Sequence, residues 1–154
     1  MNGGGKMIYA KYDALDVAEY VLWYCEHSLT KPITNLQLQK ILYYIQGRYI
    51  AQHGEPLFDN DIEAWSYGPV IPDVYYEYKG FISDSITGVS PKTKDLFEAY
   101  EIELIQNVVK KTYKMNVWEL VRKTHEEYPW KKNYKPGIKK EILVEDLIEY
   151  FTKI

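Results

Sequence analysis

The chain has 154 residues and a formal net charge of −3, and this length predicts one domain without room for a second. Apolar residues make up 46% and charged residues 27% of the sequence, which excludes disordered and low-complexity proteins. Sixteen tyrosines and four tryptophans occur beside four phenylalanines, so most aromatic side chains need a hydrogen-bonding partner when buried. We expect residues 1–11 to form a flexible leader and residues 12–154 to form the single domain.

Two helices are predicted in the first third of the chain. Asp13 can cap a helix whose apolar spacing continues to about residue 28. Thr34 and Gln37 have the spacing of a capping box, and Gly54 is suited to end the helix that they begin. Apolar residues occur on nearly every side of this second helix. We therefore expect it to lie at the centre of the fold.

A short strand follows the second helix. Within residues 61–67, Ile62 and Ala64 would face one side of a strand, and Glu63 and Trp65 would face the other. This alternation predicts a short strand. Gly68 and Pro69 are expected to end this strand, because proline cannot donate a hydrogen bond to a sheet. The sharp turn that results should display Tyr67 or Val70 at a rim.

Helical patterns account for the middle of the chain. Pro72 suits the first turn of a short helix that extends to residue 78 and is capped by Gly80. Residues 82–89 fit either a second short strand or a loop. Apolar residues at helical spacing then predict a long helix over residues 90–114.

The last quarter of the chain is predicted to hold two more helices. Asn116 can cap a helix that extends to about residue 127, and residues 141–151 form the final one. Pro129 and Gly137 bracket a lysine-rich loop between them. The predicted fold class is therefore mainly α, a compact orthogonal bundle of about six helices with at most one short β-hairpin.

Charge is distributed unevenly along the sequence. Residues 110–140 contain ten basic and three acidic residues, a net charge of +7. Such a stretch fits an acidic partner or RNA, or else the solvated side of a helix and a loop. Arg48 and Arg122 are the only arginines, and arginine is the side chain that binds phosphate and guanine through paired hydrogen bonds. Direct nucleic-acid binding is therefore disfavoured.

The cysteine count and the hydropathy indicate the compartment. Cys25 is the only cysteine, so the chain cannot form an internal disulfide, which fits a reducing cytoplasm. No stretch approaches the roughly 18 apolar residues that a membrane span needs. We therefore expect a cytoplasmic protein without membrane contact.

The sequence does not contain a recognisable catalytic or metal-binding motif. His27, His53 and His125 are too scattered to form a local metal site. His125 and Glu126 begin like a zinc-protease helix, but Pro129 stands where the second histidine is required. We predict no catalytic residues, no cofactor and no metal.

Lys40 is unusual because it interrupts the apolar second helix. Its natural counterpart is Glu63, the acidic residue within the predicted strand. The favoured interpretation is a structural ion pair that ties the strand to the central helix. A catalytic pair is the alternative, and an enzyme would need His125 in the same pocket.

The segment around the predicted turn is rich in large aromatic residues. Such residues are typical of protein-binding hot spots, or of platforms that stack single-stranded RNA. A tyrosine-rich core whose hydroxyl groups reach the rim is the alternative. The candidate partner-binding residues are Trp65, Tyr67, Val70, Tyr75, Tyr76 and Tyr78.

Four stretches of the sequence resemble a known family. They are LQLQKILYYIQGRYIAQHG at residues 36–54, PLF at 56–58, IEAWSYGPVIP at 62–72 and LVRKTHEEYPW at 120–130. These stretches are similar to the Panacea domain, with its pattern K-L-x-Y-Y, G-x-P-L-F, E-A-W-x-Y-G-P-V and T-H-x-x-x-P-W. That domain occurs in phage-associated proteins of the GepA type and in SocA-like antitoxins. The motif residues are Gly54, Pro56, Leu57, Phe58, Gly68, Pro69, His125, Pro129 and Trp130, and Ile41 stands where the pattern has leucine.

The resemblance implies a function as well as a fold. It implies an α-rich domain that neutralises a protein toxin, with toxin and antitoxin encoded side by side on prophages and in bacterial genomes. It implies no enzymatic activity and no cofactor. Many members carry an extra DNA-binding domain, and this chain has no room for one, so we do not expect it to regulate its own gene by DNA contact.

Three functional hypotheses follow. The first is an antitoxin-like module that masks a toxin or delivers it to a cellular protease. The second is a small nucleic-acid-binding regulator that uses residues 110–140. The third is an enzyme that uses Lys40, Glu63 and His125.

Overall fold

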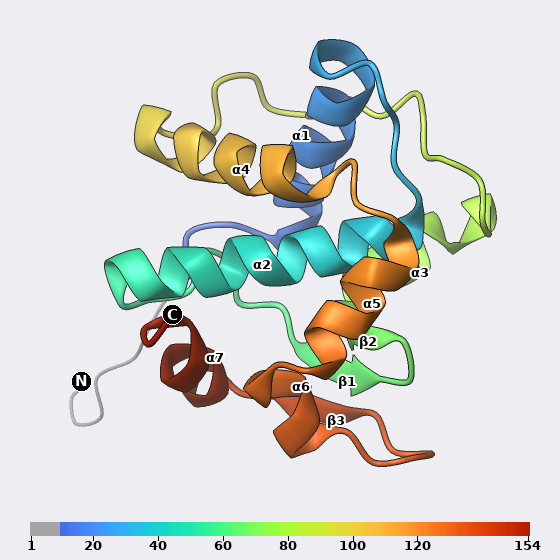
Figure 1. Cartoon of the computed structure of the whole chain (residues 1–154). Helices are drawn as coiled ribbons and strands as arrows, with labels where there is room; N and C mark the ends of the chain where they lie inside the picture. The colour runs from blue at the N-terminus through green and yellow to red at the C-terminus, as the bar shows by residue number, and fades with distance from the viewer. Residues whose placement is uncertain (1–9) are drawn as a thin grey trace.

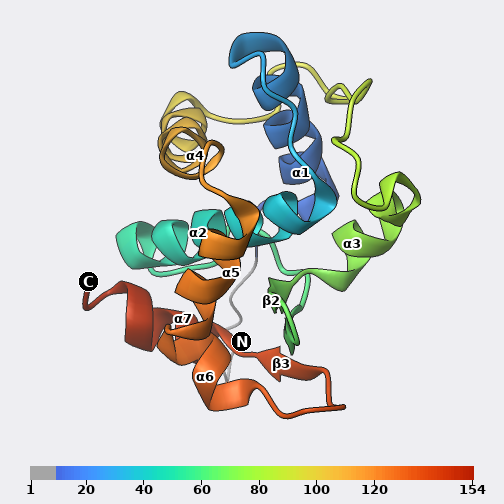
Figure 2. The same cartoon turned by 45° about the vertical axis from the view of Figure 1, so that its right-hand side comes forward.

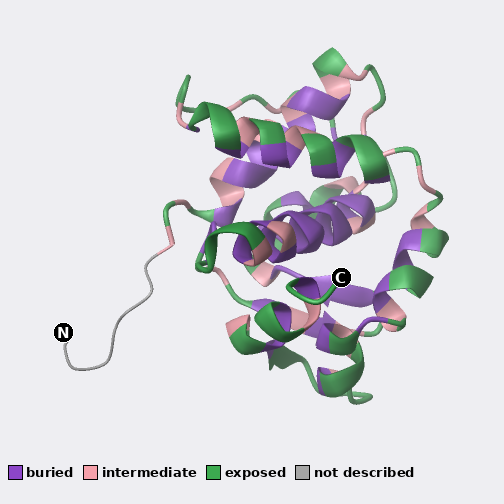
Figure 3. Ribbon diagram, turned by 60° about the vertical axis from the view of Figure 1, so that its left-hand side comes forward, coloured by how far each residue is buried: buried purple, intermediate pink, exposed green. Residues whose placement is uncertain are grey.

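Helix α2 is the element around which the rest of the protein packs. The computed structural model describes residues 10–154, and α2 (Asn35–His53) runs through its middle (Figure 1). Its neighbours are α1 (Ala14–Trp23), β2 (Gly68–Val70), α3 (Pro72–Tyr78), α4 (Ala99–Thr112), α5 (Val117–His125) and α7 (Val144–Phe151). Most residues of α2 are buried (Figure 3). The predicted central helix is confirmed.

The ends of α2 are fixed by the residues that the sequence indicated. The side chain of Thr34 accepts a hydrogen bond from the backbone N–H of Gln37, and the Gln37 side chain accepts one from the Thr34 N–H. Gly54 follows the helix with φ of 75°, a conformation that glycine adopts without strain.

The first helix is also as predicted, with one change of geometry. Asp13 caps α1 by accepting a hydrogen bond from the N–H of Leu15. After Trp23 the chain continues as a turn of π-helix, η1 (Tyr24–Ser28). The helical segment therefore reaches residue 28, although its last turn is wider than an α-helix.

The sheet is larger than the predicted hairpin. Strand β1 (Ile62–Trp65) pairs with β2 through a two-residue turn, and its other edge pairs with β3 (Lys140–Ile142), in the order β2-β1-β3. Gly68 and Pro69 were expected to end the strand, and they instead form the returning strand β2. Proline is tolerated there because β2 is an edge strand, where not every N–H is needed.

The middle of the chain differs from the prediction in two places, at the start of α4 and at Gly80, and it decides between the two alternatives for residues 82–89. Helix α4 begins at Ala99 rather than near residue 90, because Glu98 and Glu101 form the capping box that starts it. Residues 82–89 form a loop rather than a strand. Gly80 does not cap α3 but lies within the 3₁₀ turn η2 (Lys79–Phe81).

The C-terminal part contains two elements that the sequence pattern missed. Residues that were predicted to be a lysine-rich loop include α6 (Tyr128–Asn133), in which Pro129 occupies the first turn where no N–H donor is needed. Strand β3 precedes α7, so the last helix begins at Val144 rather than at residue 141. Residues 10–154 thus form seven α-helices and a three-stranded antiparallel sheet. The mainly α class is confirmed, and "at most one hairpin" was wrong.

Most of the other elements lie in two groups on opposite sides of α2 (Figure 2). Figure 2 shows α1 and α4 on one side of α2 and the group α5, α6, α7 and the sheet on the other. Most of the predicted leader lies outside the described residues, and Lys11, near its end, contacts Glu101 of α4 at 3.1 Å. Among residues 10–154, no helix is long and apolar enough to cross a membrane.

We predict that Gly47→Ala destabilises the protein. A Cβ atom at position 47 would overlap the ring of Phe151, so α7 would have to move away from α2. Overpacking of this kind costs about 2 kcal/mol of the free energy of unfolding, measurable by urea denaturation. Gly80→Ala is the matched control, because no atom lies within 4 Å of the Cβ that it adds. Equal unfolding free energies for the two variants would contradict the prediction.

Candidate functional site

Two groups of aromatic rings lie at the hairpin, one shared with α3 and one shared with the start of α5, and we call them together the aromatic surface. We define it by Trp65, Tyr67, Tyr75, Tyr76 and Trp118. The ring of Trp65 lies 5.1 Å from that of Tyr75 and 6.1 Å from that of Tyr76, between ring centroids. At the hairpin turn, Tyr67 packs edge-on against Trp118 at 5.4 Å.

Three aromatic rings of this surface are about half exposed to solvent. Tyr67 is 56% exposed, Tyr76 51% and Trp118 54%. Exposed Tyr and Trp side chains supply much of the binding energy at protein interfaces, because they bury a large area with few rotatable bonds. This surface is therefore the candidate partner-binding site.

Two of the residues predicted to bind a partner do not belong to it. Val70 is 3% and Tyr78 6% exposed, so neither can reach a partner while the protein stays folded. Tyr78 is buried because it shares a face of α3 with Val74, four residues earlier, and that face packs on the core.

Trp118 belongs to the surface and was missed as a site residue. The sequence pattern predicted only the helix that contains it, which begins after Asn116. The signal was present in the spacing, because Leu120 and Val121 form the buried face of α5. Trp118 precedes Leu120 by two positions, which places it about 200° away around the helix.

Two lysines and a carboxylate border the aromatic surface. The ammonium of Lys139 lies 4.1 Å from the centre of the Trp65 ring, and that of Lys79 lies 5.5 Å from the Tyr76 ring. The indole N–H of Trp65 donates a 2.8 Å hydrogen bond to Glu63. These contacts hold the Trp65 ring in one orientation on the outer face of the sheet.

The expected ion pair between Lys40 and Glu63 does not form. Lys40 is fully buried and donates a 3.1 Å hydrogen bond to the carbonyl oxygen of Pro69, while Glu63 bonds Trp65 instead. Glu63 is on the outward-facing side of β1, so its carboxylate points away from α2. Burial lowers the pKa of Lys40 to about 7.

The hairpin approaches α2 and α5 so closely that one position must be glycine. Gly68 has φ of 108°, and a Cβ atom there would lie 2.7 Å from the Thr124 hydroxyl and 2.8 Å from Cε of Lys40. The backbone of β2 therefore rests directly on the Lys40 side chain. This contact makes Gly68 and Pro69 structural residues.

His125 and Trp130 hold the other side of the hairpin. The two rings are stacked with centroids 3.9 Å apart, and the Trp130 indole N–H donates a 2.8 Å hydrogen bond to the carbonyl of Trp65. Burial lowers the pKa of His125, which favours the neutral imidazole. A neutral ring packed in this way fits a structural role.

Glu127 binds several side chains at once and was not predicted to do so. It is 3% exposed and accepts hydrogen bonds of 2.9 Å from Tyr43, Tyr44 and Lys123. Burial and the nearby carboxylate raise the pKa of both tyrosines. These two tyrosines therefore belong to the core, and their hydroxyl groups are bonded to Glu127.

The remaining motif residues fix the loop after α2. Pro56, Leu57 and Phe58 are buried. The Gln46 amide donates a 2.6 Å hydrogen bond to the Phe58 carbonyl and accepts one of 2.9 Å from the Leu57 N–H. Most of the motif residues thus lie inside the scaffold, while Tyr67 of the same pattern is exposed on the aromatic surface.

No catalytic or metal site is assembled by these residues. Lys40 has no exposed surface, and Glu63 lies on the outer face of the sheet, so the two cannot act on one substrate together with His125. Within residues 10–154, no three His, Cys, Asp or Glu side chains are grouped so as to hold a metal ion.

The fold and the site define a class of protein, a small helical domain in which buried polar contacts fix a hairpin beneath an exposed aromatic surface. Comparison with known proteins then gives the family. Residues 38–131 match the family described as "Antitoxin SocA-like, Panacea domain", and the chain belongs to it.

One relative supports the assignment over a shorter stretch. The antitoxin SocA of Caulobacter vibrioides (strain NA1000 / CB15N) is 50% identical over 48 residues, which are 31% of this chain and 26% of that protein. The match therefore spans about a quarter of the relative's length. No solved structure matches the chain.

We predict that Lys40 makes stability depend on pH. Its pKa is about 7 in the folded protein and 10.5 in the unfolded chain, so unfolding takes up a proton between these values. Stability therefore rises with pH over this window, by roughly 2 kcal/mol between pH 7 and pH 9. Urea denaturation across the window should show this rise in the wild type and lose it in Lys40→Met.

The control for this prediction is Lys110→Met, which removes an exposed lysine of α4. It should keep the dependence of the wild type. A rise of equal size in the Lys40→Met protein would show that another group causes it.

Proposed function

We propose that this protein is an antitoxin-like binding module that neutralises a cognate protein toxin through the aromatic surface on the hairpin, α3 and α5. The observation that carries the proposal is the group of half-exposed rings at Tyr67, Tyr76 and Trp118 on a rigid support. Membership in the SocA-like antitoxin family supports a toxin as the partner. We expect an adjacent gene to encode this toxin.

The rigidity of the support favours direct binding. Strand β2 is held from below by Lys40, and β1 is held from the side by Trp130. Surface rings on a fixed backbone lose little conformational entropy when a partner covers them. The hairpin is therefore suited to bind a toxin without rearranging.

A strained and exposed isoleucine follows the 3₁₀ turn η2. Ile82 follows η2 with φ of 55° and is 83% exposed. A β-branched residue in this conformation is strained, and such residues occur often at functional sites. An isoleucine that is both strained and exposed fits a role in contact with a partner.

The same surface serves two mechanisms of neutralisation. In masking, the bound antitoxin covers the active site of the toxin and the complex accumulates. In delivery, the antitoxin brings the toxin to a cellular protease and the toxin disappears. Masking is the mechanism that we propose first, because it needs only the one surface. Measuring the amount of toxin in cells with and without the antitoxin separates the two.

A binding role accounts for the site better than catalysis does. The residues that would carry chemistry, Lys40 and His125, are occupied in holding the hairpin. The exposed residues of the site are aromatic rings, which contribute contact area rather than acid, base or nucleophile.

The first experiment expresses the product of each neighbouring gene alone and together with this protein. We expect one product to stop growth alone, to be tolerated in the presence of this protein and to co-purify with it. The proposal is wrong if no neighbouring product is toxic and none co-purifies.

We predict that Tyr67→Ala and Trp118→Ala each weaken binding of that toxin about tenfold or more, because large aromatic anchors contribute about 2 kcal/mol to an interface. Their melting temperatures should stay near that of the wild type, since both rings are more than half exposed. Binding can be measured by isothermal titration calorimetry.

The matched control is Tyr100→Ala, which removes a tyrosine that is 44% exposed at the start of α4. It should bind the toxin as the wild type does. If all three variants bind equally well, the toxin uses another face of the molecule.

A further inference from the structure

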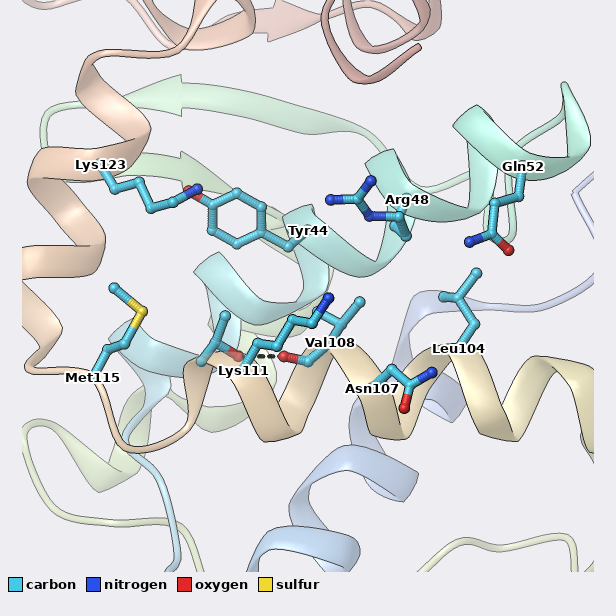
Figure 4. A pocket seen from close by; sticks show the side chains of 10 residues that line it. Tyr44, Arg48, Gln52, Leu104, Asn107, Val108, Lys111, Met115 and Lys123 are labelled. Atoms are coloured by element: carbon cyan, nitrogen blue, oxygen red, sulfur yellow. Dashed lines mark hydrogen bonds between the residues drawn. The ribbon is translucent and has the colours of Figure 1, made fainter. Parts of the chain in front are cut away.

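A basic groove lies between α2 and α4, apart from the aromatic surface. It has a volume of about 250 Å³. Arg48 and Tyr44 of α2 form one wall, Lys111 and Asn107 of α4 form the other, and Met115 lies at one end (Figure 4). Lys123 of α5 reaches over the same end.

The charges of the groove are not balanced by its own residues. Arg48, Lys111 and Lys123 line it, and none of the lining residues is acidic. Lys123 is paired with Glu127 at 2.9 Å. Arg48 and Lys111 form no salt bridge with any of residues 10–154. The groove therefore carries two free positive charges, one on each wall.

The groove combines these charges with an apolar floor. Leu104 and Val108 project into it from α4, and the Tyr44 ring contributes from α2. The Tyr44 hydroxyl is fixed by Glu127 at 2.9 Å, and the Lys123 ammonium lies 4.4 Å from the centre of its ring. These contacts keep the floor in place without a ligand.

We infer that this groove binds an acidic peptide segment of a partner protein, with two carboxylates placed between Arg48 and Lys111 and an apolar side chain on the floor. The guanidinium of Arg48 is suited to a carboxylate because it can donate two parallel hydrogen bonds. Net charge of opposite sign also speeds the encounter of the two surfaces.

The groove is poorly suited to a nucleic acid. Tyr44 is 8% exposed, so no free ring is available to stack a base. Other lysines of the basic segment lie elsewhere, and Lys132 on α6 is bonded to Asp146 at 2.6 Å. Two free cations in a small groove do not form the extended track that a sugar–phosphate chain follows.

This inference rests on the proposed function and deepens it, because it gives the toxin a second point of attachment through an acidic segment. The two sites share no residue, so they can be tested separately. The probe is a fluorescein-labelled peptide with the sequence Glu-Glu-Leu-Glu-Glu, and its control is Gln-Gln-Leu-Gln-Gln. Neither probe requires the toxin.

Fluorescence anisotropy should show that the acidic peptide binds the full chain and that the glutamine peptide does not. Arg48→Ala and Lys111→Ala should each weaken binding about tenfold, because each removes a charged hydrogen-bond donor. The control Lys110→Ala, on the same helix but outside the groove, should bind as the wild type does. Circular dichroism checks that each variant is folded.

Three outcomes would overturn the inference. The first is equal binding of the acidic peptide by Arg48→Ala, Lys111→Ala and the control Lys110→Ala. The second is no binding of the acidic peptide by the wild type. The third is tighter binding of a labelled oligouridylate of similar charge that the same two substitutions remove, which would make the occupant a nucleic acid.

A variant of the other site separates this inference from the proposed function. Tyr67→Ala should lose the toxin and keep the acidic peptide. If the peptide binds as expected while no neighbouring product is toxic, the groove is an acidic-peptide site and the antitoxin role fails alone.

Discussion

The whole structure depends on one constraint, which is that α2 is buried along most of its length although it carries polar side chains. These side chains need hydrogen-bonding partners, and several of them find one in the loop or the hairpin that follows α2 in the chain. Gln39 binds the backbone N–H of Ile71, Lys40 binds the carbonyl of Pro69, and Gln46 binds both Leu57 and Phe58. The order of polar residues along α2 therefore sets where the loop and the hairpin attach.

The family motif is explained mainly by this scaffold. Gly68 is required because β2 rests on Lys40, and Trp130 is required because its indole holds the carbonyl of Trp65. Both residues therefore act through the scaffold that positions the hairpin.

The two proposed sites would recognise a partner through different interactions, apolar contact at one site and charge at the other. The rings at Tyr67 and Trp118 contribute apolar area and shape, which set affinity. Arg48 and Lys111 contribute charge in a groove that contains no carboxylate, which sets orientation and the class of segment that fits. Glu63 of β1 lies opposite Glu141 of β3, so the sheet carries two neighbouring negative charges, opposite in sign to those of the groove.

The sequence by itself determined the helices that local signals define and the family that the motifs define. Thr34 with Gln37, Asp13 and Asn116 are caps whose partners are two or three residues away, so they can be read from neighbours in the chain. The tertiary structure alone decided the partners of Lys40 and Tyr43, which are 29 and 84 residues distant. It also decided the burial of Tyr78, strand β3 and the basic groove, because each depends on which surfaces meet after the chain has folded.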